Sequence, residues 1–177
     1  MTRSRGEKFY VFHSKAEERR NEFIGKPKPG ITICPECRAV FFEKHWHHAD
    51  SAVYRSAKTK GKEVHYALCP ACKMEKEHTY EGHLKILRAP SAQESEMMSL
   101  ILNFVNREYK RNCQHRLLRF RRVGKRGTYE FEFSDNQLAV RLARALQKRF
   151  KKVEVAIRYP HEPLKVSEVT LSFPHNH

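Results

Sequence analysis

The chain has 177 residues, 40% of them hydrophobic, which is enough for one ordinary domain or two small ones. Its 35 Lys and Arg against 20 Asp and Glu give a formal net charge of +15, so the chain attracts polyanions, of which nucleic acid is the commonest in a cell. No apolar window of about 18 residues is present, and the basic N-terminus lacks an apolar core; both features argue against a transmembrane helix and a secretory signal.

Residues 1–29 are predicted to form a basic N-terminal arm that ends at a breaker cluster, Lys26-Pro27-Lys28-Pro29-Gly30. The arm carries eight Lys or Arg and four Glu. We expect Arg3, Arg5 and Lys8 to contact RNA phosphates, and the aromatic residues that follow them are suited to stack on bases. A disordered tail without a binding role remains the alternative.

Residues 30–90 are predicted to form a zinc-binding domain, because they contain two C-P-x-C motifs, Cys34 to Cys37 and Cys69 to Cys72, with 31 residues between them. A C-x-x-C turn spaces two sulfur atoms like two corners of a tetrahedron, and two such turns complete a four-sulfur shell for Zn²⁺ at about 2.3 Å per bond. A closed shell has no position for a reacting water, so the expected site is structural. Free cysteines, two disulfides or an iron–sulfur cluster are the alternatives.

Paired cysteines of this kind are typical of metal binding in a reducing compartment, so we expect a cytoplasmic protein. The fifth cysteine, Cys113, is expected to be a packing residue. Near the first motif, Trp46, His47 and His48 are predicted RNA contacts. A second metal held by the histidines is the alternative interpretation of that cluster.

Residues 91–177 are predicted to form a basic RNA-binding domain with the element order α-β-β-α-β-β. The first helix begins with Ser91 and Glu94 at capping-box spacing and runs to Arg111; its apolar face includes Tyr109. The second helix begins at Ser134, runs to about Phe150, and has Leu138, Leu142, Ala145 and Leu146 facing the core. The strands from 153 to 159 and from 169 to 173 alternate apolar and polar residues.

A β-hairpin is predicted between these helices, with the loop Gly124-Lys125-Arg126-Gly127. This loop sets Val123 opposite Thr128, and the same register pairs Phe120 with Phe131, Leu118 with Phe133, Arg121 with Glu130, and Arg119 with Glu132. Aromatic pairs then share one face and opposite charges share the other, which supports the register.

The stretch from Arg107 to Lys152 carries fifteen Lys or Arg and four acids, a net charge of +11. Such a surface binds phosphates without reading sequence, so structured RNA is the expected partner; a merely solvated basic surface is the alternative. The RNA contacts predicted here are Arg122, Lys125, Arg126, Arg141, Arg144, Lys148, Lys151 and Lys152. Arg119 and Arg121 are expected to pair with glutamates instead.

Two stretches resemble a known family. The cysteine motifs with the segment CKMEKEHTYEGHLKIL from Cys72, and the segment GTYEFEFSDNQLAVRLARALQKRF from Gly127, are similar to the zinc-binding region of the eukaryotic and archaeal large-subunit (60S) export adaptor family, the nonsense-mediated-decay protein three type. The resemblance covers residues 30–160 and implies zinc binding by the four cysteines, binding to the large ribosomal subunit near the tRNA sites, and no catalysis. The family carries more than one four-cysteine set, so the resemblance points to a short bacterial relative that acts in assembly, hibernation or rescue.

The expected fold class is α+β: a small four-cysteine zinc-knuckle domain, an α-β-β-α-β-β sandwich and a basic N-terminal arm. The expected function is that of a non-enzymatic, ribosome-associated factor that binds ribosomal RNA and one structural Zn²⁺. Ribosomal proteins are further expected contacts, with no membrane and no small-molecule substrate as partner.

Two other functions stay open. An HNH-like zinc nuclease is one, because His47-His48-Ala49-Asp50 lies between the cysteine motifs, although residues 49–68 lack the Asn of that family and Lys73 follows the second motif. A zinc-ribbon protein-interaction adaptor, whose basic charge meets an acidic partner, is the other.

Overall fold

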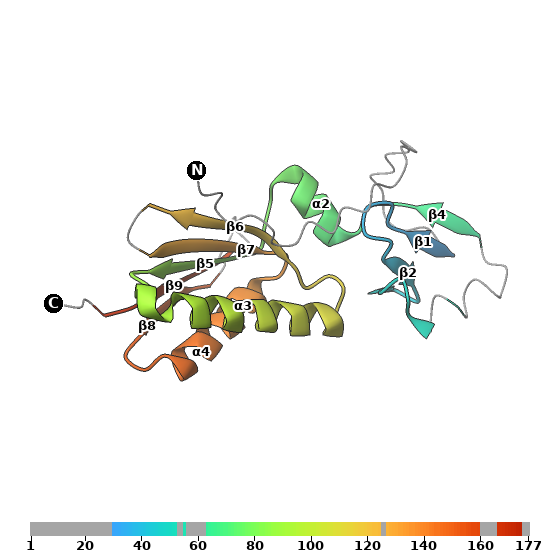
Figure 1. Cartoon of the computed structure of the whole chain (residues 1–177). Helices are drawn as coiled ribbons and strands as arrows, with labels where there is room; N and C mark the ends of the chain where they lie inside the picture. The colour runs from blue at the N-terminus through green and yellow to red at the C-terminus, as the bar shows by residue number, and fades with distance from the viewer. Residues whose placement is uncertain (1–29, 53–54, 56–62, 125–126, 160–165, 175–177) are drawn as a thin grey trace, which may run out of the picture. The chain divides into compact units, whose positions relative to one another are not determined.

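The computed structural model describes residues 30–52, 55, 63–124, 127–159 and 166–174, and is shown in Figure 1. Its contacts divide the chain into two compact units, Met1–Leu68 and Cys69–His177. The described residues form three helices and two sheets, which confirms a mixed α+β fold. The predicted arm, with Arg3, Arg5 and Lys8, lies outside the described residues.

The first unit contains a sheet of short strands in the order β3-β2-β1-β4. Their bounds are β1 Ile31–Ile33, β2 Val40–Phe42, β3 His45–His47 and β4 Val64–Tyr66. β1 and β2 are antiparallel, whereas β1 and β4 are parallel. The buried core of this unit is small: Ile31, Val40 and Phe42, with Ile33 packed against them.

The second unit contains a larger sheet in the order β6-β7-β5-β9-β8 and three helices. The bounds are α2 Pro70–Glu77, β5 Gly82–Leu87, α3 Ser91–Arg111, β6 Leu117–Val123, β7 Thr128–Phe133, α4 Asn136–Arg149, β8 Glu154–Arg158 and β9 Ser167–Ser172. Figure 1 shows α3 and α4 on the same side of this sheet, where their apolar residues join one core.

The position of β5 differs from the predicted division of the chain at residue 90. We expected residues 30–90 to form the zinc domain by themselves, yet β5 is the central strand of the second sheet, antiparallel to β7 and parallel to β9. Every second residue of β5 is buried, including Leu84 and Ile86. Six residues with three large apolar side chains are a short and weak strand signal in a histidine-rich segment, and the strands that pair with them lie far away in the chain.

Both long helices lie close to their predicted ranges, but their caps differ from the predicted capping boxes. The N-cap of α3 is Pro90, and no side-chain cap bond is formed there. α4 is capped by Asp135, whose carboxylate accepts from the backbone N–H groups of Gln137 and Leu138. Ser134, the predicted cap, instead uses its hydroxyl oxygen to accept from the N–H of Arg116 at 2.8 Å. Within the described part of the chain, no helix has the length and apolarity needed to cross a membrane.

The helix faces agree with the sequence pattern at most positions. Met97, Ile101, Leu138, Leu142 and Leu146 are buried. Tyr109, which continues the apolar spacing of α3, is 37% exposed, and the guanidinium of Arg116 lies 5.8 Å from the centre of its ring. Ala145 is only half-buried, because Ala139, Val140 and Ala143 fill the α4 side of the core.

The hairpin β6–β7 has the predicted register over most of its length. Val123 pairs with Thr128, Phe120 with Phe131, Arg121 with Glu130 and Arg119 with Glu132. The predicted pair of Leu118 with Phe133 is wrong: a register shift between Leu117 and Arg119 places Leu117 opposite Phe133. An extra residue in one strand is a β-bulge, which strict alternation along a sequence does not reveal.

Candidate metal centre and nucleic-acid interface

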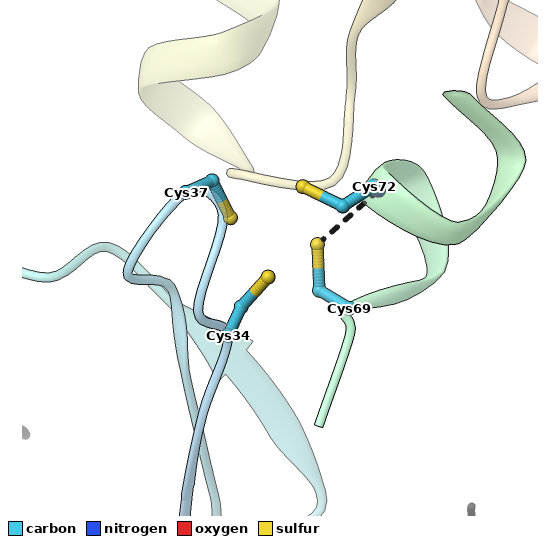
Figure 2. Close-up of side chains that lie close together, drawn as sticks. All are labelled: Cys34, Cys37, Cys69 and Cys72. Carbon is cyan, nitrogen blue, oxygen red and sulfur yellow. Dashed lines mark hydrogen bonds between the residues drawn. The ribbon is translucent and has the colours of Figure 1, made fainter. Parts of the chain in front are cut away.

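Four cysteines form the only group of three or more metal-ligand side chains among the described residues. The sulfur atoms of Cys34, Cys37, Cys69 and Cys72 all lie within 4.8 Å of one another. Figure 2 shows the four side chains pointing toward a common centre. Cys34, Cys69 and Cys72 are buried, Cys37 is half-buried, and none of them forms a disulfide. The predicted cysteine cluster is therefore confirmed as a site that could hold a metal ion.

Parallel strand pairing explains why the two cysteine motifs meet. Ile33, the last residue of β1, pairs with Tyr66, the last residue of β4, and the N–H of Ala67 donates to the carbonyl of Ile33 at 3.2 Å. Because both strands run in the same direction, the segments that follow them leave from the same end of the sheet. Cys34 follows β1 directly, and Cys69 comes three residues after β4.

Each motif is held by local hydrogen bonds. In the first, the N–H of Cys34 donates to the carbonyl of Ala39 at 2.8 Å, and Arg38 adopts a left-handed conformation with φ of 61°. In the second, Cys69 is the N-cap of α2, and its sulfur accepts from the N–H of Cys72 at 3.4 Å, the dashed line in Figure 2. Pro70 at the first helical position needs no hydrogen-bond partner, and the positive end of the helix dipole favours negative charge on these sulfurs.

The sequence did not predict one basic side chain, Arg116, that contacts the cysteine cluster. Nη1 of Arg116 donates to the sulfur of Cys72 at 3.3 Å, and its Nε donates to the carbonyl of Cys113 at 3.0 Å. The side-chain oxygen of Gln114 accepts from the N–H of Ala71 at 3.2 Å. The segment from 113 to 116 thus binds the start of α2 at two points. The sequence carries no signal of this contact, because 44 residues separate Cys72 from Arg116.

The donor set suits a tetrahedral thiolate metal site. Zinc–sulfur bonds of about 2.3 Å imply sulfur–sulfur edges of about 3.8 Å, and the sulfur atoms here lie within 4.8 Å of one another, so no edge exceeds that of the ideal tetrahedron by more than about 1 Å. Cys113 is buried, as expected of a packing residue, and does not belong to the cluster. Within the described residues, the histidines form no second group of three ligands.

The residues predicted around Trp46 lie on β3, an edge strand of the first sheet. Trp46 pairs with Phe41 across the strands, with ring centres 5.4 Å apart. Nε2 of His47 lies 3.3 Å from the carbonyl oxygen of Phe42, and His48 follows the strand. All three predicted contacts are half-buried, so each keeps some surface accessible to a partner.

Basic side chains are distributed unequally over the second unit. On the sheet face that carries the hairpin charges, Arg119 pairs with Glu132, Arg121 lies 3.0 Å from Glu130, and Lys85 lies 3.4 Å from Glu130. On the helices and just after α4, five exposed cations form no ion pair with any described residue: Lys110, Arg144, Lys148, Lys151 and Lys152. Most of the described cations of this unit without an ion pair thus lie in the helical layer, by which we mean α3, α4 and the turn after α4, although Arg158 on β8 is also exposed.

Two of the predicted RNA contacts form internal ion pairs. Arg141 on α4 lies 3.0 Å from the buried Glu108 of α3. Arg122 lies 3.6 Å from Glu94 and 5.7 Å from the ring centre of Tyr129. Burial first, and then Glu94, raise the pKa of Tyr129 to about 12, so this phenol stays neutral near pH 7. Lys125 and Arg126, at the tip of the hairpin, lie outside the described residues.

No protein-family model, no curated protein and no solved structure matches this chain.

Proposed function

We propose that this chain is a non-catalytic RNA-binding protein built around one structural Zn²⁺, and that its RNA is ribosomal. Four thiolates from Cys34, Cys37, Cys69 and Cys72 would close the coordination shell. A closed shell offers no position to a substrate or a reacting water, which supports a structural role. The ion would join the turn after β1 to the first turn of α2.

The observation that carries RNA binding is the concentration of unpaired cations in the helical layer. On the other sheet face, Arg119 and Arg121 pair with Glu132 and Glu130, so most of the positive charge of the hairpin there is neutralised. Arg144, Lys148, Lys151 and Lys152 are exposed and available to phosphates. Such contacts release counterions and position a protein on nucleic acid without reading its sequence.

The choice of the large ribosomal subunit rests on the resemblance to the export adaptors. In this proposal the cations of the helical layer bind phosphates of ribosomal RNA near the tRNA sites. Trp46, His47 and His48 add contacts from the first unit, and the arm and the hairpin tip supply the remaining predicted cations. The step served would be assembly, hibernation or rescue, in the cytoplasm.

Sedimentation of the tagged protein through sucrose gradients tests this proposal. At low salt the protein is expected to sediment with large subunits or whole ribosomes. At high salt, or after RNase treatment, it should remain at the top of the gradient. Retention at the top at low salt would contradict ribosome binding. A complex that survives RNase would favour a protein-interaction adaptor instead.

Two double variants separate the helical layer from the sheet face. Arg144→Gln with Lys148→Gln removes two exposed cations from α4, and Arg121→Gln with Arg158→Gln removes two exposed cations from the sheet. The α4 variant should bind a fluorescein-labelled RNA hairpin more weakly. Its salt slope, the steepness with which the logarithm of the binding constant falls with the logarithm of the salt concentration, should be lower by about 2, because each phosphate contact contributes about 1. The sheet variant should retain the wild-type slope. Equal losses in both would contradict a helical binding surface.

A further inference from the structure

Glu108 is a buried carboxylate surrounded by basic side chains. It lies in the last turn of α3, and its side chain is only 4% exposed. Its oxygens lie 3.0 Å from Nη1 of Arg141, 3.5 Å from Nη1 of Arg111, 3.6 Å from Nδ1 of His115 and 3.9 Å from Nε of Arg107. Three arginines from two helices thus converge on one acid.

These arginines remain open to solvent. The side chains of Arg107, Arg111 and Arg141 are 64%, 68% and 37% exposed. One carboxylate balances one of the three charges, so the cluster keeps a surplus of two positive charges. A guanidinium has five N–H donors, and each recorded ion pair to Glu108 involves a single nitrogen. Nε of Arg141 is buried, but the other donors that do not face Glu108 are left for another acceptor.

A purely structural role explains the cluster only in part. Arg141 alone could neutralise the buried carboxylate, and further arginines add mutual repulsion with little gain in pairing. Guanidinium groups gathered around one carboxylate are suited to a phosphate group, which accepts two parallel N–H bonds from one guanidinium. The surplus charge and the convergence of the three arginines both point to an anion that completes the cluster.

We propose that Arg107, Arg111 and Arg141 form a binding site for one backbone phosphate of RNA, with Glu108 as the positioning residue beneath them. This inference rests on the proposed function and names the residues at the centre of its surface. Glu108 fixes the directions of the guanidinium groups, so that they lose little conformational freedom when a phosphate binds.

Substitution of Glu108 tests this site, because the two explanations predict opposite changes in RNA affinity. Glu108→Gln and Glu96→Gln make the same change of charge on the same helix, but Glu96 is 45% exposed and, within the described part of the chain, pairs with the single cation Arg149. If charge alone determines affinity, both variants should bind a fluorescein-labelled RNA hairpin more tightly. If Glu108 positions the arginines, Glu108→Gln should bind about tenfold more weakly, the equivalent of one charge-assisted hydrogen bond, and should lose about 1 from the salt slope.

A second variant, Arg111→Lys, keeps the site testable if Glu108→Gln fails to fold. Arg111→Lys keeps the charge at an exposed position, so the fold should be unaffected, yet it removes the planar fork and should weaken RNA binding severalfold. Thermal melting shows whether Glu108→Gln is folded. If wild-type protein binds no RNA at low salt, the proposed function fails together with this site. If wild-type protein binds RNA while Arg111→Lys and Glu108→Gln bind like Glu96→Gln, only the phosphate site is contradicted.

Discussion

At the scale of single residues, the five cysteines fall into two groups. Four lie within 4.8 Å of one another at their sulfurs, and Cys113 is buried outside that cluster. Cys69→Ser removes one ligand and should abolish stable metal binding, because three thiolates leave the shell open. Cys113→Ser is the matched control and should retain one metal per chain. Elemental mass spectrometry of the purified variants measures both, and zinc absent from wild-type protein would contradict the proposed ion.

Arg116 gives a second prediction at this scale. Its N–H bond to the sulfur of Cys72 is expected to stabilise the negative charge of a metal-bound thiolate. Arg116→Met should therefore weaken metal binding by about tenfold to a hundredfold, the usual effect of losing a neighbour that supports a ligand. Competition with a chromogenic chelator measures the affinity. Arg88→Met, which removes an equal charge and a bond to the carbonyl of Phe173, should retain wild-type affinity.

At the scale of elements, the hairpin β6–β7 contains a matched pair of glycines. Gly124 and Gly127 both have left-handed φ, 70° and 60°, so alanine at either position costs about 1 kcal/mol in backbone strain. A Cβ at Gly124 would meet nothing within 4 Å, whereas a Cβ at Gly127 would lie 2.2 Å from the carbonyl oxygen of Ala89. Gly127→Ala should consequently destabilise the protein by several kcal/mol more than Gly124→Ala, as measured by urea unfolding. Equal losses would show that the contact with Ala89 yields at little cost.

At the scale of the whole molecule, the two units differ greatly in their cores. Among the described residues, the core cluster of the first unit has three buried members, too few to stabilise a small domain alone, whereas the second unit has a continuous core that includes Phe131, Leu142 and Leu171. Removal of metal with a chelator should therefore unfold β1 to β4 and leave the large sheet folded. Hydrogen exchange measures this: amides of β1 and β2 should lose protection, while those of β5 and β7 keep it. Retained protection in β1 would mean that the first unit needs no metal.

Much of the second unit could be predicted because its signals are local. The apolar spacing of residues 97–105 and 138–146 indicated both helices, and the glycine-bounded loop determined the hairpin register. The bulge at Leu118 could not be foreseen, because an extra residue in a strand leaves no trace in the alternation of side chains. Asp135 replaced Ser134 as a cap because Ser134 bonds to a segment some twenty residues earlier in the chain.

The sequence by itself determined the two cysteine motifs, the two long helices, the hairpin and the excess of basic charge, since each depends on residues close together in the chain. Only the tertiary structure decided that β5 lies between β7 and β9, that β1 and β4 run parallel and deliver Cys34 and Cys69 to the same end, and that Arg116 reaches Cys72. It also decided which cations are paired, as Arg141 is with Glu108, and which stay exposed, as Arg144 does. The reason is that parallel pairing and the burial of a charge depend on partners distant in the sequence, and no local periodicity encodes them.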